Sequence, residues 1–192
     1  TGTNKYLQVA DNPSFQVGDA DFTLAFWIYA KGNSTFISKG NAFWTAEDGG
    51  FIVRRFETLD FTVGNGTTMA TISFAGAILN AWHFIVCGYD ATNDRIFMSV
   101  DCGTEITAAL AGGMGSSNTP FVVGKSLALG EPANGMLDEI GFWKRKLTNA
   151  EIDILYNFGL GTTYPMAKWT GHTPLWTGLY AYIPLNEASG NR

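Results

Sequence analysis

Three loops of this chain carry side chains that could bind a sugar. The segment NAFWTAEDGG (41–50) offers an indole beside two carboxylates, while GNGTTM (64–69) and LALGEPANG (127–135) offer amides and a further carboxylate. An aromatic face set beside groups that bond hydroxyls is the chemistry a glycan site needs. The predicted glycan-binding residues are Trp44, Glu47, Asp48, Asn65, Glu131 and Asn134. The competing interpretation of Trp44 is a core residue, the usual position of Trp in a sandwich.

Asp138 lies within an apolar segment, MLDEIGFW (136–143). In an extended strand it shares a face with Ile140 and Phe142, while Glu139 points to the other side. A carboxylate among apolar neighbours needs backbone amides or a cation as its partner. The residues themselves leave both interpretations open.

The sequence shows no spacing typical of a catalytic centre. His83 falls in a strand-like segment and His172 in an irregular one, and neither cysteine has a histidine near it in the sequence. The glycines lie in turns and form no phosphate-binding loop ahead of a helix. We therefore predict no catalytic residues.

The charge balance limits the partners. The 192 residues carry a net charge of −5 and no Lys/Arg-rich stripe. Nucleic acids and anionic membranes are bound mainly through positive charge, so we expect neither as a partner. The longest apolar runs fall well short of the roughly 18 residues of a membrane span. Because neither an initiator Met nor a signal-type segment stands at Thr1, we expect a processed protein or a piece of a longer one.

Cys87 and Cys102 are predicted to be free thiols. They lie on one hairpin that turns at 91–94, so that Cys87 faces Met98. Cys102 then stands about 13 Å further along the strand at ~3.3 Å per residue. A disulfide spans at most roughly 7 Å between Cα atoms.

Short apolar or alternating segments, separated by Gly, Asn and Asp, predict strands along most of the chain. They cover 6–9, 22–30, 35–40, 50–56, 59–64, 70–74, 82–89, 95–101, 119–125 and 136–143. This spacing is typical of an antiparallel sandwich or barrel. Both faces of 22–30 are apolar, which indicates a central strand.

The C-terminal third departs from this pattern. Thr148 and Glu151 have the spacing of a capping box and Gly159 is a terminator, so a short helix is predicted near 148–158. Residues 165–178 show no periodicity and are interpreted as a linker. The segment 179–192 reads as a strand followed by a turn. Its alternating apolar positions are Leu179, Ala181 and Ile183.

Three stretches of the chain together match a known pattern. They are NKYLQVADNPSFQVGDADFTLAFWIYA (4–30), WHFIVCGYDATNDRIFMSVDCG (82–103) and NGMLDEIGFWKRKLTNAEIDILYNFG (134–159). They resemble successive segments of the LamG-like family of laminin G and concanavalin A-like jelly rolls. The third is the most specific, because a Gly-x-(Ile/Leu)-Asp-Glu strand leads into an Arg/Lys-x-Leu-(Thr/Ser)-x-x-Glu-Ile helix. The resemblance implies an all-β, antiparallel jelly-roll β-sandwich with one short α-helix.

The same resemblance implies that the strand which usually comes first in this family comes last in this chain. Domains of this family begin with a strand like GLVAYYPFDEGSGN, and here the matching GLYAYIPLNEASGN (178–191) comes at the C-terminus. We expect a domain over 1–164 without its usual first strand, a linker over 165–178 and a strand over 179–192. That strand completes its own sandwich, a neighbouring subunit's sandwich or the next repeat, and all three alternatives are open.

The resemblance also bears on metals and catalysis. Calcium lies at the rim of many LamG-like domains, which implies Asp138 as a Ca²⁺ ligand together with Asn4 or the turn at 187–191. β-Glucanases of the same superfold carry Glu-x-Asp-x-(x)-Glu on a strand. EIDIL (151–155) resembles that motif, but its second Glu is missing and its capping box predicts a helix.

The predicted function is a non-catalytic carbohydrate-binding or adhesion module of a secreted, cell-surface or virion-associated protein. Its partner would be a glycan or a surface polysaccharide. The first alternative is a structural repeat that self-assembles by donating residues 179–192 to another copy. The second alternative is a glycoside hydrolase.

Overall fold

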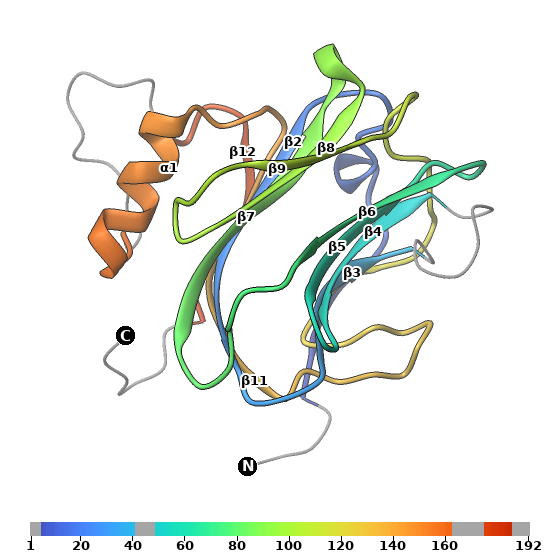
Figure 1. Cartoon of the computed structure of the whole chain (residues 1–192). Coiled ribbons are helices and arrows are strands. Elements are labelled where there is room, and N and C mark those ends of the chain that lie inside the picture. Colours follow the sequence, from blue (N-terminus) through green and yellow to red (C-terminus); the bar gives the residue numbers. More distant parts are fainter. Residues whose placement is uncertain (1–4, 41–48, 163–174, 186–192) are drawn as a thin grey trace.

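The computed structural model describes residues 5–40, 49–162 and 175–185 and consists of two facing six-stranded sheets (Figure 1). In spatial order, the first sheet contains β1 (Leu7–Val9), β10 (Phe121–Val123), β3 (Ser34–Lys39), β4 (Gly50–Arg55), β5 (Leu59–Gly64) and β6 (Met69–Phe74). The second contains β12 (Leu179–Ile183), β11 (Gly135–Trp143), β2 (Phe22–Ala30), β7 (Trp82–Asp90), β8 (Arg95–Val100) and β9 (Ile106–Ala109). The helical elements are η1 (Pro13–Phe15), η2 (Ala91–Asn93), α1 (Asn149–Tyr156) and η3 (Asn157–Gly159). All strand pairs within the two sheets are antiparallel, so the predicted sandwich is confirmed.

The predicted segments agree with the observed strands, with one strand missed. β9 (Ile106–Ala109) was not predicted, because it is a short edge strand whose residues are largely exposed and show little apolar alternation. β2 lies between β11 and β7, as expected for a central strand. Cys87 faces Met98 across the β7–β8 hairpin, and both cysteines are free thiols, as predicted.

The main core fills the space between the sheets. Alternate residues of β2, among them Phe22, Leu24 and Phe26, point into it and are fully buried. Phe15, on η1, closes the core beside β10 and β11, with its ring centroid 4.7 Å from Phe121 and 5.3 Å from Phe142. Aromatic pairs at these separations add to the free energy gained by burying apolar area.

A second apolar cluster covers the outer face of the second sheet. Trp27 and Phe84 point outward there, and Tyr156 of α1 stacks against them with ring centroids 5.9 and 6.0 Å away. Figure 1 shows α1 on this outer side. The helix begins at the predicted capping box, in which Thr148 and Glu151 satisfy each other's backbone N–H groups. The helix therefore covers a face that would otherwise expose large aromatic side chains to water.

Asp138 does not share a face with Ile140 and Phe142, and this part of the sequence interpretation was wrong. Glu139 adopts a left-handed conformation (φ 51°), and the β11–β2 register shifts by one residue between Asp138 and Gly141. Such a bulge reverses the side-chain alternation beyond it. Asp138 consequently lies opposite Trp27 on the outer face, while Ile140 and Phe142 enter the core.

The C-terminal strand β12 pairs with β11 of its own chain at the edge of the second sheet. Ala181 and Ile183 pack against the main core, whereas Leu179 packs against the outer cluster. The three residues do not share a face, because Tyr180 is an extra residue in the β12 register. The division of the chain into domain, linker and closing strand stays a prediction.

We expect truncation after Gly178 to lower the free energy of unfolding by about 3 kcal/mol, a drop of roughly 10 °C in Tm. The reason is that β11 loses its edge partner and core side chains become exposed. Thermal unfolding and light scattering on the intact and truncated chains measure both stability and mass. Truncation after Leu185, which keeps β12, is the matched control and should unfold close to the intact chain. If the intact chain instead forms assemblies that truncation after Gly178 dissolves, the strand is donated between copies.

Candidate functional site

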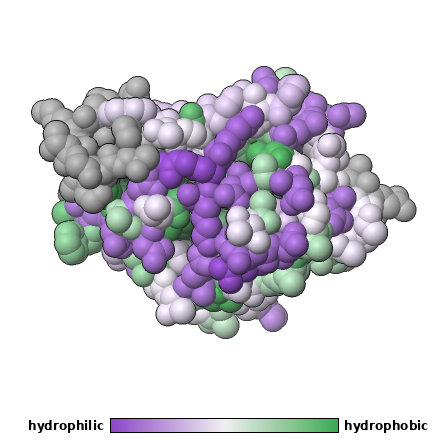
Figure 2. Space-filling view, turned by 90° about the horizontal axis from the view of Figure 1, so that it is seen from above, coloured by the Kyte–Doolittle hydropathy of each residue, from purple (hydrophilic) through white to green (hydrophobic). Residues whose placement is uncertain are grey.

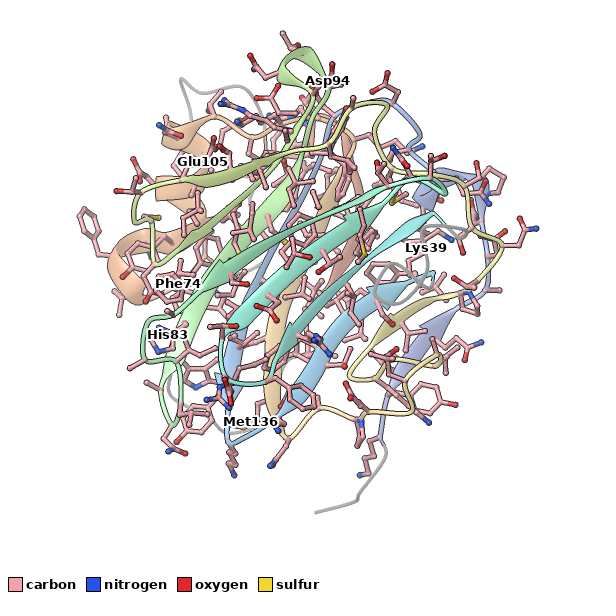
Figure 3. All side chains as sticks on the ribbon, turned by 45° about the vertical axis from the view of Figure 1, so that its right-hand side comes forward. Lys39, Phe74, His83, Asp94, Glu105 and Met136 are labelled. Atoms are coloured by element: carbon pink, nitrogen blue, oxygen red, sulfur yellow. The ribbon has the colours of Figure 1, made fainter. Side chains whose placement is uncertain are left out.

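Three of the predicted glycan-binding residues, Asn65, Glu131 and Asn134, lie in the described ranges, and Asn65 is at the opposite end of the sandwich from Asn134. Asn65 belongs to the end that carries η2, because its turn bonds to the 111–115 segment, which in turn contacts Asp94. Asn134 immediately precedes β11 at the other end. Figure 3 shows the two ends through the labelled Asp94 and Met136. A small ligand that contacts Asn65 therefore does not also contact Asn134, and the predicted glycan-binding residues stay a prediction.

Trp44, Glu47 and Asp48 lie outside the described residues, but the backbone on both sides of their loop is well defined. Glycine is required there, because a Cβ on Gly40 would overlap the carbonyl oxygen of Gly49. A Cβ on Gly49 would in turn overlap the backbone of Gly115. The connection between β3 and β4 therefore starts and ends at one point, beside the turn that contains Asn65.

Asn65 shapes the turn after β5. Its side-chain oxygen accepts hydrogen bonds from the backbone N–H groups of Thr67 (3.0 Å) and Thr68 (2.8 Å). Its amide donates to the carbonyl of Ala111 at 2.8 Å. These bonds occupy much of the side chain, so Asn65 acts first as a rigid support for this end of the sheet.

Carboxylates that sequence reasoning missed also gather at this end. The hydroxyl of Tyr89 lies 3.1 Å from Asp19 Oδ1 and 3.0 Å from Asp94 Oδ1, and it accepts a hydrogen bond from the N–H of Gly113. Burial raises the pKa of Tyr89, and the two carboxylates act in the same direction. The three residues come from separate segments, and no local motif joins them in the sequence.

The surface of this end suits a polar ligand. Figure 2 looks onto it and shows a largely hydrophilic face. Next to Gly40, a hollow of about 260 Å³ on the first sheet is lined by Ser38, Thr119, Pro120 and Leu127, among others. The end with η2 thus combines polar groups, a shallow hollow and the base of the loop that carries Trp44.

The remaining two predicted residues lie beside the start of β3. Thr35 Oγ1 donates to Glu131 Oε2 at 3.3 Å, and the backbone N–H of Asn134 donates to Ser34 Oγ at 2.9 Å. Four residues of β3 separate Thr35 from Lys39 at the η2 end, which corresponds to about 13 Å. Glu131 and Asn134 therefore support the loop that packs over β3.

Asp138, the predicted calcium ligand, is buried, and its Oδ1 accepts a hydrogen bond from the N–H of Glu139 at 2.9 Å. Asn4 and the 187–191 turn lie outside the described residues. Within the described part of the chain, no three His, Cys, Asp or Glu side chains are grouped closely enough to hold a metal ion.

The carboxylates of EIDIL lie on α1, as the capping box predicted. Arg145 donates two hydrogen bonds of 2.7 Å to Glu151, which also accepts from the N–H of Thr148 at 2.9 Å. Burial acts to raise the pKa of Glu151, but the bonds from Arg145 and Thr148 outweigh it and hold the pKa below its ordinary value of 4.5. Arg145 also donates to the Thr177 carbonyl at 2.6 Å. Glu151 thus joins the helix to the segment that leads into β12.

The fold is that of a laminin G-like jelly roll. The family model of the concanavalin A-like lectin/glucanases superfamily, Laminin_G_3, matches residues 1–153. The chain therefore belongs to this family. No curated protein matches the chain.

Solved structures share the fold at low sequence identity. A proposed carbohydrate-binding protein from Bacteroides ovatus matches 98% of this chain and 52% of its own, with 16% identity and a TM-score of 0.67. The LG4-5 domains of the mouse laminin α1 chain match 68% of this chain and 37% of theirs (14% identity, TM-score 0.52). A SAP-like pentraxin from Limulus polyphemus matches 71% and 69% (17% identity, TM-score 0.51). The chain thus spans little more than half of the first protein and about a third of the second.

The described part of the chain contains no helix with the length and apolar character needed to cross a membrane.

The substitution Arg145→Gln should destabilise the protein by about 3 kcal/mol at about pH 7, because it leaves the buried Glu151 carboxylate without its cation. A carboxylate with a lowered pKa stabilises the fold above its unfolded pKa and loses this effect as the pH falls through its folded pKa. The cost of the substitution should therefore shrink as the pH falls from about 7 into the acid range and Glu151 becomes protonated. Urea unfolding of both proteins across this range measures it.

Lys144→Gln is the matched control, since it removes a neighbouring exposed cation that lies over the Tyr180 ring. It should cost little at any pH. An Arg145→Gln penalty that stays the same at low and neutral pH would show that the ion pair is not what stabilises this region.

Proposed function

We propose that this chain is a non-catalytic carbohydrate-binding or adhesion module of a secreted, cell-surface or virion-associated protein. The observation that carries the proposal is the arrangement at the η2 end. There, Gly40 and Gly49, which flank the segment that contains Trp44, pack closely together beside the Asn65 turn, and the described surface of this end is hydrophilic. A rigid sandwich that presents variable loops is a common basis for binding sites.

The comparisons give general support. The structure with the widest coverage of this chain among those described above is that of the proposed carbohydrate-binding protein. At such low identity the likeness shows only a shared fold, so the proposed ligand of this chain rests on its own residues. Trp44 supplies the aromatic face, and Glu47 and Asp48 supply acceptors for sugar hydroxyls.

The EIDIL carboxylates give little support to hydrolysis. A glycosidase needs two carboxyl groups facing one groove on either side of the scissile bond. Glu151 is instead buried 2.7 Å from both terminal guanidinium nitrogens of Arg145, and Asp153 lies on the exposed side of the helix. This geometry favours a structural role for Glu151.

Calcium is part of the proposal, with Asp138 and Asn4 as the candidate ligands. Carboxylate and amide oxygens are suitable partners for Ca²⁺. Isothermal titration with CaCl₂ after treatment with EDTA tests this directly. We expect wild-type protein to bind calcium and the Asp138→Asn variant to bind it more weakly. Equal binding by both would remove Asp138 from the site.

Self-assembly through residues 179–192 is the second candidate function. It is favoured by the position of β12, which is an edge strand that pairs only with β11 among the described strands. Exposed edges of this kind can pair with other chains. The truncations described for the fold distinguish the two arrangements.

A printed array of neutral glycans and surface polysaccharides, probed with labelled protein, tests glycan binding. We expect Trp44→Ala to weaken binding about tenfold or more, because it removes the stacking surface. Trp176→Ala is the matched control, since Trp176 is an exposed tryptophan (54% exposed) outside the 41–50 segment, and it should bind like the wild type. Absence of binding to any glycan would overturn the proposal, and equal losses in both variants would remove Trp44 from the site.

A further inference from the structure

A cavity of about 390 Å³ lies between the start of α1 and the turn that follows β8. It is far from the Gly40 hollow, which is on the first sheet, and none of the predicted glycan-binding residues lines it. Figure 3 shows Glu105, on its rim, next to the helix. Its volume is within the usual range for small-ligand sites, roughly 300–1,000 Å³.

The floor of the cavity contains an unusual polar group. Ser99 is only 8% exposed, yet its hydroxyl makes no hydrogen bond with any residue in the described ranges. Because this hydroxyl lines the cavity, it can exchange hydrogen bonds with water or with a ligand there. The other floor residues, Cys102 and Ile152, bond to each other through the Cys102 thiol and the Ile152 carbonyl, 3.9 Å apart. Ser99 therefore faces the cavity with its hydrogen-bonding capacity unused.

The cavity walls are rich in acceptors. Glu105 and Thr104 line one side, and Asn149 and Asp153 of α1 line the other. Lys146 Nζ lies 3.2 Å from Glu105 Oε1 and so offsets one of the two carboxylates. Asp153 has no ion pair with any described residue, and its charge contributes to raising the pKa of Cys102 to about 12, after the larger effect of burial.

The lining selects the chemistry of a ligand. Two carboxylates repel anions, and the scarcity of apolar side chains beyond Ile152 gives little affinity for a hydrophobic molecule. A ligand with several hydroxyl groups suits the cavity best. One hydroxyl can donate to a carboxylate or amide oxygen of the wall while another forms a hydrogen bond with Ser99. The described residues of the lining include no aromatic ring, so the contacts that they offer a ligand are hydrogen bonds and not stacking.

We propose that this cavity binds a neutral, hydroxyl-rich saccharide unit, with Ser99 at its floor and Asp153 and Asn149 at its rim. The inference extends the proposed function and rests on it, because it adds a second subsite on the outer face of the second sheet. A saccharide chain could then engage the protein at two separate places, or one protein could hold two chains.

Nitrogen-15 NMR titration of the full chain with lactose, maltose and chitobiose tests the proposal. We expect at least one disaccharide to shift backbone amides in 99–105 and 149–153. Ser99→Ala should weaken this binding about fivefold, the value of one hydrogen bond, and Ser99→Leu should abolish it by filling the cavity. Thr107→Leu on β9 is the matched control, since it alters an exposed hydroxyl residue outside the cavity and should leave affinity unchanged.

The outcomes separate the two proposals. Shifts confined to the η2 end, lost in Trp44→Ala and unchanged in both Ser99 variants, would overturn the cavity subsite and keep the proposed function. If neither these disaccharides nor the glycan array gives binding, both proposals fail. If the amide spectrum of Ser99→Leu loses its dispersion, that variant is unfolded and Ser99→Ala becomes the test. An unchanged disaccharide affinity in Ser99→Ala would then reject the subsite.

Discussion

The structure depends on the burial of both faces of β2. One face of this central strand supplies the core between the sheets, while the other carries Trp27 and Ala25 outward. A sandwich with two sheets covers only the first of these faces. The second is covered by α1 and by Leu175, which accepts a hydrogen bond from the indole of Trp143 at 2.6 Å. The short helix is therefore a required third layer.

The Arg145–Glu151 ion pair holds α1, the third layer, in position on the second sheet. Arg145 stands two residues after the end of β11, Glu151 belongs to the capping box of α1, and the same guanidinium donates to the carbonyl of Thr177 ahead of β12. The buried Glu151 carboxylate, through Arg145, thus links the segment after β11, the start of α1 and the segment before β12. The motif that most resembles a catalytic sequence carries this structural role.

Both candidate ligand regions lie where regular elements end. At the η2 end, close contacts between glycine backbones set the base of the Trp44 loop. On the outer face, a helix that must dock for reasons of burial leaves a polar cavity against the turn after β8. The strands and helix supply rigidity, and the turns between them supply hydrogen-bonding groups.

The sequence by itself determined the positions of the strands other than β9, the capped helix, the free thiols and the family resemblance. Each of these follows from residues close together in the chain, through alternation, capping chemistry or hairpin geometry. Only the tertiary structure decided that Asp138 faces outward, because a single left-handed residue, Glu139, reverses the alternation that sequence reasoning extends unchanged. It alone separated Asn65 from Asn134 and brought Ser99 beside Asp153. These juxtapositions depend on how sheets and helix pack across long sequence separations, which local patterns do not encode.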